Sequence, residues 1–122
     1  MNTSEATKNT LQRGKELAKL YRDLIAIEAD IVIYVEMVMK YQHWLDTGTD
    51  DRGNPIDGEK DETLTILIAD LLQSITESAE IAWDVRNEIA RLISESIAEA
   101  NSVFLAATQG LKGYKSIYVS PK

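Results

Sequence analysis

The chain has 122 residues, 44% of them hydrophobic, and no cysteine. This length predicts one domain whose core needs no covalent staples, and the lack of cysteine excludes disulfides, thiolate metal sites and a cysteine nucleophile. The formal net charge is −7, and only residues 110–122 are clearly basic, with three lysines and no acid. Because a phosphate backbone is bound by clustered lysine and arginine, direct nucleic-acid binding is disfavoured.

The first ten residues, MNTSEATKNT, are polar and contain no apolar core of the kind that secretory signals carry. No stretch reaches the roughly 18 uncharged apolar residues that a membrane-spanning helix needs. We therefore expect no membrane span and a cytoplasmic location, in a cell or in an infected host cell.

Residues 10–46 are predicted to form a long helix, because their apolar residues recur at alternating spacings of three and four. A β-strand does not produce a heptad pattern over this length. The pattern therefore outweighs the local β-propensity of IVIYV. We expect the residues at its a and d positions to form an interface with other helices. They are Leu17, Leu20, Leu24, Ile27, Ile31, Tyr34, Val38, Tyr41 and Leu45.

A second apolar stripe runs beside the first and consists of Ala18, Tyr21, Ile25, Val32, Val35 and Met39. An apolar arc this wide suits a helix that contacts more than one neighbour, as in a bundle. Asp30 and Glu36 fall on the polar side of the helix, whereas Glu28 occupies an e position of the heptad, at the edge of the apolar arc. If a partner helix covers the arc, Glu28 needs a hydrogen bond or a cation, so we assign it to the interface.

Residues 47–62 are predicted to form an acidic loop, since glycine, proline, asparagine and aspartate are gathered there in one polar run. A connection this long is unusual inside a compact domain and is often mobile or functional. An EF-hand is excluded, because counting from Asp51 places Gly53 and Pro55 where oxygen ligands are required.

Residues 63–109 are predicted to form the second helix, which stops at Gly110. Their apolar residues follow a stripe near the 3.6-residue period, interrupted only at Val85 and Arg86. Small residues near Ser74–Ser78 allow a bend or a break, which no proline forces. The stripe consists of Leu64, Ile68, Leu71, Ile75, Ala79, Ala82, Ile89, Ile93, Ile97, Ala100, Phe104 and Ala107.

The tail, residues 110–122, changes character, because YKSIYV is aromatic, β-branched and weakly alternating. This pattern predicts an extended arm or a short strand. We expect Tyr114, Lys115, Ile117 and Tyr118 to contact a partner in a strand-like manner, since an isolated strand needs a partner edge.

Two E-x-x-E pairs, Glu59 with Glu62 and Glu77 with Glu80, have 14 residues between them. This spacing resembles the E-x-x-E…E-x-x-D signature of the all-α NTP pyrophosphatases related to MazG and the dimeric dUTPases. The resemblance covers about 25 residues and implies helix-borne carboxylates that hold Mg²⁺ against the phosphates of a nucleotide. The chain departs from the signature twice: Glu80 replaces the closing aspartate, and the first pair lies in a loop or a first helical turn.

Other catalytic chemistry has little support in the sequence. His43, the only histidine, lies near the end of the first helix, where the helix dipole favours a surface histidine. Neither a Glu-x-x-His motif nor a nucleophile elbow is present. Glu77, Glu80, Asp84 and Glu88 form an acidic ridge, which is either a solvated face or a docking strip for a basic partner. We expect no catalytic residue, no metal site and no cofactor.

The sequence predicts an all-α fold: a single domain over residues 1–122 built as a long antiparallel helical hairpin, which forms a four-helix bundle by dimerisation. A lone hairpin leaves much of its apolar arc in water, so we expect a homo-oligomer, most simply a dimer. The expected function is a non-enzymatic interaction or assembly module that binds itself and another protein. An adaptor, small chaperone, inhibitor or structural subunit of a bacterial or viral system fits. The alternatives are the Mg²⁺-dependent nucleotide pyrophosphatase and an oligomer that sequesters a small ligand.

Overall fold

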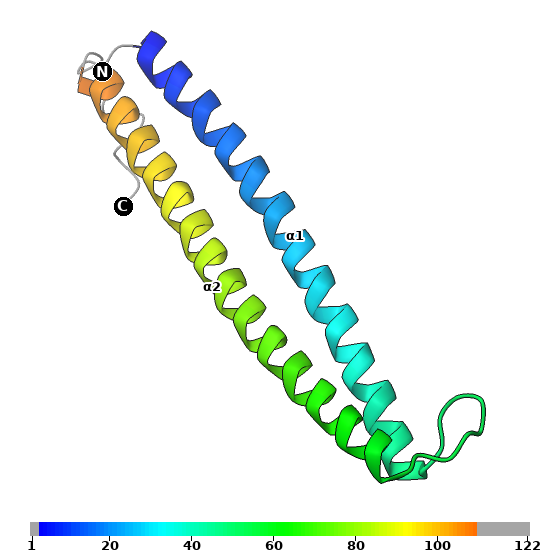
Figure 1. Cartoon of the computed structure of the whole chain (residues 1–122). Helices are drawn as coiled ribbons and strands as arrows, with labels where there is room; N and C mark the ends of the chain where they lie inside the picture. The colour runs from blue at the N-terminus through cyan, green and yellow to red at the C-terminus, as the bar shows by residue number, and fades with distance from the viewer. Residues whose placement is uncertain (1–2, 110–122) are drawn as a thin grey trace, which may run out of the picture. The chain divides into compact units, whose positions relative to one another are not determined.

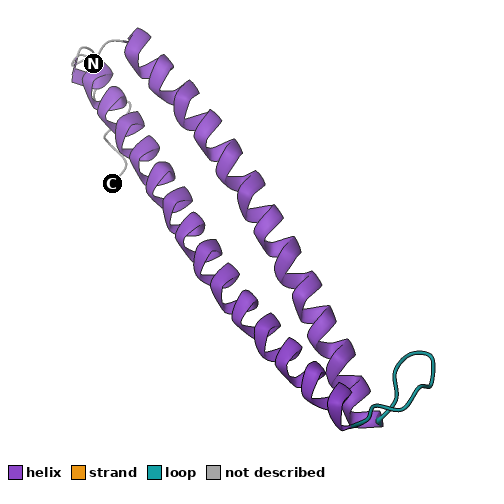
Figure 2. Ribbon diagram, viewed as in Figure 1, coloured by secondary structure: helices purple, strands orange, loops and turns teal. Residues whose placement is uncertain are grey.

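The computed structural model describes residues 3–109, which form two long helices and the loop between them (Figure 1, Figure 2). Helix α1 spans Thr3–Thr47 and helix α2 spans Gly58–Gln109. The predicted all-helical hairpin is therefore confirmed, and residues 3–109 contain no strand. Neither helix has a stretch long and apolar enough to cross a membrane within this range. The expected strand-like tail, with Tyr114, Lys115, Ile117 and Tyr118, lies outside the described residues.

The chain divides into two compact units, each of which contains a segment of both helices. The loop unit is Leu20–Arg86. The described part of the terminal unit consists of residues 3–19 and 87–109. In the loop unit the helices run antiparallel, because Glu28 of α1 contacts Arg86 of α2, and Trp44 lines the same groove as Leu64.

The a and d residues of α1 lie against α2 of the same chain. Leu24 is buried, and the other residues of this predicted interface are half-buried: Leu17, Leu20, Ile27, Ile31, Tyr34, Val38, Tyr41 and Leu45. We call the a and d positions of both helices the seam. The seam is a contact within the chain, and a role of these residues between subunits stays a prediction.

The seam residues of α2 recur every 3.5 residues on average, whereas the sequence predicts an apolar stripe with a period near 3.6 residues. These seam residues are buried or half-buried: Leu64, Ile68, Leu71, Ile75, Ser78, Ala82, Val85, Ile89, Leu92, Ser96 and Glu99. The remaining members of the expected stripe are exposed: Ala79, Ile93, Ile97, Ala100, Phe104 and Ala107. A 3.6-residue stripe drifts by about 20° per heptad from a 3.5-residue seam, so it leaves the seam along a helix this long.

Both helices are longer than the apolar periodicity predicts. Helix α1 begins at Thr3 rather than near residue 10, because no glycine or proline interrupts the helix there. Helix α2 begins at Gly58 because Asp57 caps it, accepting a hydrogen bond of 2.9 Å from the Lys60 N–H. It then continues unbroken through Ser74–Ser78. The loop is thus shorter than the expected 47–62.

The substitutions Leu92→Ala and Ile93→Ala test the register of α2. Leu92 is 3% exposed on the seam, whereas its neighbour Ile93 is 40% exposed. We expect Leu92→Ala to lower the free energy of unfolding by about 2–4 kcal/mol and Ile93→Ala by about 1 kcal/mol or less. Urea unfolding followed by circular dichroism at one fixed protein concentration measures both losses. A loss for Ile93→Ala equal to that for Leu92→Ala would contradict the 3.5-residue register.

Candidate functional site

The two E-x-x-E pairs lie on one continuous helix. Glu59 and Glu62 belong to the first turns of α2, and Glu77 and Glu80 lie further along it. Glu77 comes fifteen positions after Glu62 on this helix, which corresponds to about 22 Å, so the two pairs of one chain do not meet at a single ion. Within residues 3–109, no three histidine, cysteine or acidic side chains are gathered as a metal-binding group.

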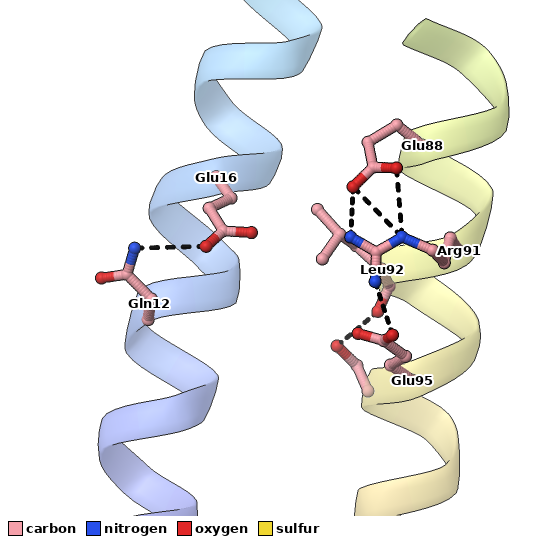
Figure 3. Close-up of polar contacts among 7 residues, drawn as sticks. Gln12, Glu16, Glu88, Arg91, Leu92 and Glu95 are labelled. Atoms are coloured by element: carbon pink, nitrogen blue, oxygen red, sulfur yellow. Dashed lines mark hydrogen bonds and ion pairs between the residues drawn. The ribbon is translucent and has the colours of Figure 1, made fainter. Parts of the chain in front are cut away.

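The acidic ridge continues into the terminal unit, where Arg91 neutralises its end (Figure 3). The Arg91 Nε–H donates hydrogen bonds of 3.1 Å to both carboxylate oxygens of Glu88. Arg91 Nη1 lies 2.5 Å from Glu95 Oε1. The hydrogen bonds from Arg91 lower the pKa of Glu88, and the two carboxylates raise the pKa of Arg91. At this end of the ridge the acidic side chains are therefore paired with an arginine of the same helix.

Backbone hydrogen bonds close the loop between α1 and α2. Gly48 ends α1 with a positive φ of 75°, a conformation that glycine adopts without steric cost. The Ile56 N–H donates to the Gly48 carbonyl at 2.8 Å, and Thr49 and Pro55 form an isolated antiparallel bridge. Backbone hydrogen bonds thus hold the two ends of this acidic loop together.

Inside the loop, Asp50 organises a tight turn. Its carboxylate accepts hydrogen bonds of 2.9 Å from the backbone N–H groups of Arg52 and Asn54. Its carbonyl accepts one of 3.0 Å from the Gly53 N–H. The hydrogen bond from the Asn54 N–H, followed by the one from Arg52, lowers the pKa of Asp50. An aspartate at the first position of a β-turn and a glycine at its fourth position are typical of type I turns.

Trp44 joins the last turn of α1 to the loop. Its indole N–H donates a hydrogen bond of 2.8 Å to Asp51. The Lys40 ammonium lies 5.0 Å from the centre of the Trp44 ring and 3.6 Å from the Asp51 carboxylate. The Tyr41 ring packs at a tilt against the Trp44 ring, with ring centres 5.2 Å apart. His43, in the same turn, is exposed, as its position in the sequence predicts.

A groove of about 400 Å³ lies beside Trp44, between the loop and the start of α2. Its volume lies within the range of small-molecule pockets. Asp50 and Asp57 on its wall already accept hydrogen bonds from the loop and the helix start. These two carboxylates therefore serve the local structure.

Glu28 finds its cation within the chain. Arg86 of α2 donates a hydrogen bond of 2.6 Å to Glu28, and both side chains stay about half exposed. The sequence predicts the need for a partner at Glu28 but not its identity, since Arg86 is 58 residues away. Only the pairing of α1 with α2 brings the two together.

The Glu28–Arg86 pair lies in an exposed apolar surface on one side of the loop unit. We call this surface the side face; it comprises the e and b positions from Tyr21 to Met39 and from Leu72 to Arg86. All its residues are exposed: Tyr21, Ile25, Glu28, Val32, Val35 and Met39 of α1, and Leu72, Thr76, Ala79, Trp83 and Arg86 of α2. Exposure reaches 68% for Ile25, 66% for Met39 and 65% for Trp83.

Both helices contribute to the side face, because one shallow groove of about 350 Å³ is lined by residues of each. Val32 and Glu28 of α1 line it together with Ala79, Trp83 and Arg86 of α2. The α1 half of this surface is the second apolar stripe predicted from the sequence. The α2 half was missed, because its residues are recognised only once the 3.5-residue register is known.

The seam of the terminal unit contains an ion pair. It is formed by Arg13 and Glu99, whose side chains are only 21% and 12% exposed. The Glu99 Oε1 atom is buried and has no hydrogen-bond partner among the described residues. A largely buried carboxylate on the seam destabilises the fold unless a cation is paired with it.

Replacing Arg13 with methionine tests this dependence. We expect Arg13→Met to lower the free energy of unfolding by about 2–4 kcal/mol, because it leaves Glu99 without its cation. The double variant Arg13→Met with Glu99→Leu should recover most of this loss, since an apolar pair suits the seam. Urea unfolding measures both, and a double variant as unstable as Arg13→Met would contradict the proposed role of the cation.

Protonation of Asp50 at acid pH should loosen the turn that its carboxylate organises. Because the pKa of Asp50 is lowered in the folded protein, its contribution is present above about pH 4, the ordinary aspartate pKa. It is lost as the pH falls through the lowered pKa. Amide hydrogen exchange by NMR should show faster exchange at Arg52 and Asn54 in Asp50→Ala, with α2 unchanged. Unaltered exchange at both amides would contradict the turn described above.

Comparison of the chain with protein-family models, with curated proteins and with solved structures found no match. The most unusual feature of the described residues is the side face, where large apolar side chains surround one ion pair.

Proposed function

We propose that this protein is a non-enzymatic interaction and assembly module that works as a homo-oligomer of helical hairpins, most simply a dimer. In this role one exposed apolar surface of the hairpin serves self-association, and the loop and the basic residues 110–122 serve the binding of another protein. An adaptor, small chaperone, inhibitor or structural subunit fits this division.

The imbalance between buried and exposed apolar side chains supports this proposal. Among the described residues only six hydrophobic side chains are buried, and none has an exposure below 2%. Sixteen large hydrophobic side chains are exposed. A protein that works as a single chain exposes scattered apolar residues, but a contiguous patch of them marks an association surface. Two helices form one seam, whereas stable helical domains bury their apolar stripes against further helices.

Light scattering coupled to size-exclusion chromatography tests self-association. At micromolar concentration we expect a mass of about twice the 13.6 kDa of one chain. Native mass spectrometry of the same sample gives the number of subunits and reveals any retained small molecule. A monomer across the accessible concentration range would contradict the proposal.

An enzymatic test separates the proposal from the pyrophosphatase resemblance. Incubation with a panel of nucleoside triphosphates and Mg²⁺ should give no turnover. Hydrolysis that Glu77→Gln abolishes, while the mass in solution stays unchanged, would overturn the non-enzymatic part of the proposal.

A further inference from the structure

We propose that the partner of the side face is a second copy of this chain, with α1 of each copy lying over α2 of the other. This inference rests on the proposed function, because it requires that the protein associates with itself. It adds the surface, the orientation and the central contacts of the dimer.

The area of the side face fits a stable interface. Seven of its residues are large and apolar, with exposures between 39% and 68%. A fully exposed aromatic side chain presents about 150–250 Å², and an aliphatic one about 60–120 Å². At roughly half exposure the two aromatic and five aliphatic side chains therefore present about 300–600 Å². A standard interface buries about 800 Å² per partner, so these seven side chains supply a large part of the area of a specific dimer, and the exposed Glu28, Thr76, Ala79 and Arg86 add to it.

The charges of the side face are those of an interface centre. Although the chain contains 20 acidic and 13 basic residues, the only charged residues of the side face are Glu28 and Arg86, which neutralise each other. Glu80 and Asp84 lie at its margin, beside Trp83. The centre of a protein interface is depleted of charge in the same way. A second copy is the partner that presents the same apolar, neutral surface.

The Glu28–Arg86 pair also selects the orientation. A two-fold axis parallel to the helices places α1 of one copy over α2 of the other at the same height. Glu28 then meets Arg86 of the second copy, and the four groups alternate in sign, which stabilises them as they lose water. A two-fold axis that crosses the helices at this pair instead places Glu28 against Glu28, where like charges repel.

Trp83 provides the anchor of this arrangement. It is 65% exposed beside the groove of about 350 Å³ whose walls include Val32, Ala79 and Ala82. Since Glu28 lies level with Arg86, Val32, four residues further along α1, lies level with Ala82, four residues earlier in α2. In the proposed dimer Val32 of one copy is therefore next to Ala79 and Trp83 of the other. An exposed tryptophan beside small residues is the pattern of an interface hot spot.

Cysteine cross-linking tests the surface and the orientation together, and the chain has no native cysteine to interfere. Val32→Cys and Ala79→Cys are purified separately, one with a larger tag, then mixed, equilibrated and treated with a short bifunctional thiol reagent. We expect the mixed Val32→Cys–Ala79→Cys product to exceed either self-product. The matched control pair Ile33→Cys and Ile81→Cys, which is equally exposed but lies outside the side face, should give little product.

The outcomes separate the inference from the proposed function. A dominant Val32→Cys self-product would show α1 over α1 and overturn the orientation. Cross-links only in the control pair, or a dimer that none of these cysteines cross-links, would overturn the side face as the interface while leaving self-association intact. A monomer by light scattering would remove both.

Trp83→Ala measures the anchor, with Ile81→Ala as its matched control. Sedimentation equilibrium should show a dimer dissociation constant raised roughly 30-fold or more by Trp83→Ala and changed by about threefold or less by Ile81→Ala. Circular dichroism confirms that each variant is still helical. Equal effects of the two substitutions, or no effect of Trp83→Ala, would overturn the assignment of Trp83.

Discussion

The pairing of α1 with α2 along one 3.5-residue seam is the constraint on which the rest of the structure depends. Each unit contains part of this seam, and the seam decides which residue of α2 faces which residue of α1. It brings Glu28 to Arg86 in the loop unit and Arg13 to Glu99 in the terminal unit. A shift of α2 by one residue would bury Ile93 in place of Leu92 and separate both ion pairs.

The same register creates the exposed apolar surface. Two helices in contact cover only the a and d positions, so apolar residues at e and b positions stay in water. In the loop unit these positions of both helices lie on one side, where they form the side face around Glu28 and Arg86. Self-association would add the second layer that a lone hairpin lacks. The Arg91 network and the Asp50 turn, by contrast, make their hydrogen bonds within the chain.

The sequence predicted the elements better than their contacts. Helix α1 follows one regular heptad pattern, so its seam and its second stripe were both visible in the sequence. The register of α2 was not, because Ile93 and Ile97 are more apolar than Ser96 and Glu99, which occupy the seam. The seam accepts Glu99 only because Arg13, which is 86 residues away, lies beside it.

Shorter-range features were missed for a different reason. Asp57 lies in an acidic run that composition assigns to a loop, although an aspartate followed by the acids of a first helical turn is also a helix start. The conformation of the loop depends on which backbone N–H groups donate hydrogen bonds to Asp50. Amino-acid composition does not reveal these hydrogen bonds. The α2 half of the side face follows from the pairing of two helices, so no single segment announces it.

In our proposal, a second copy of the chain completes this hairpin. The most direct measurement is the thermal unfolding midpoint over a roughly hundredfold range of protein concentration. When folding is coupled to association, mass action raises the midpoint with concentration. We expect such a rise in a single cooperative transition. A midpoint independent of concentration, with no dissociation step at lower temperature, would contradict it.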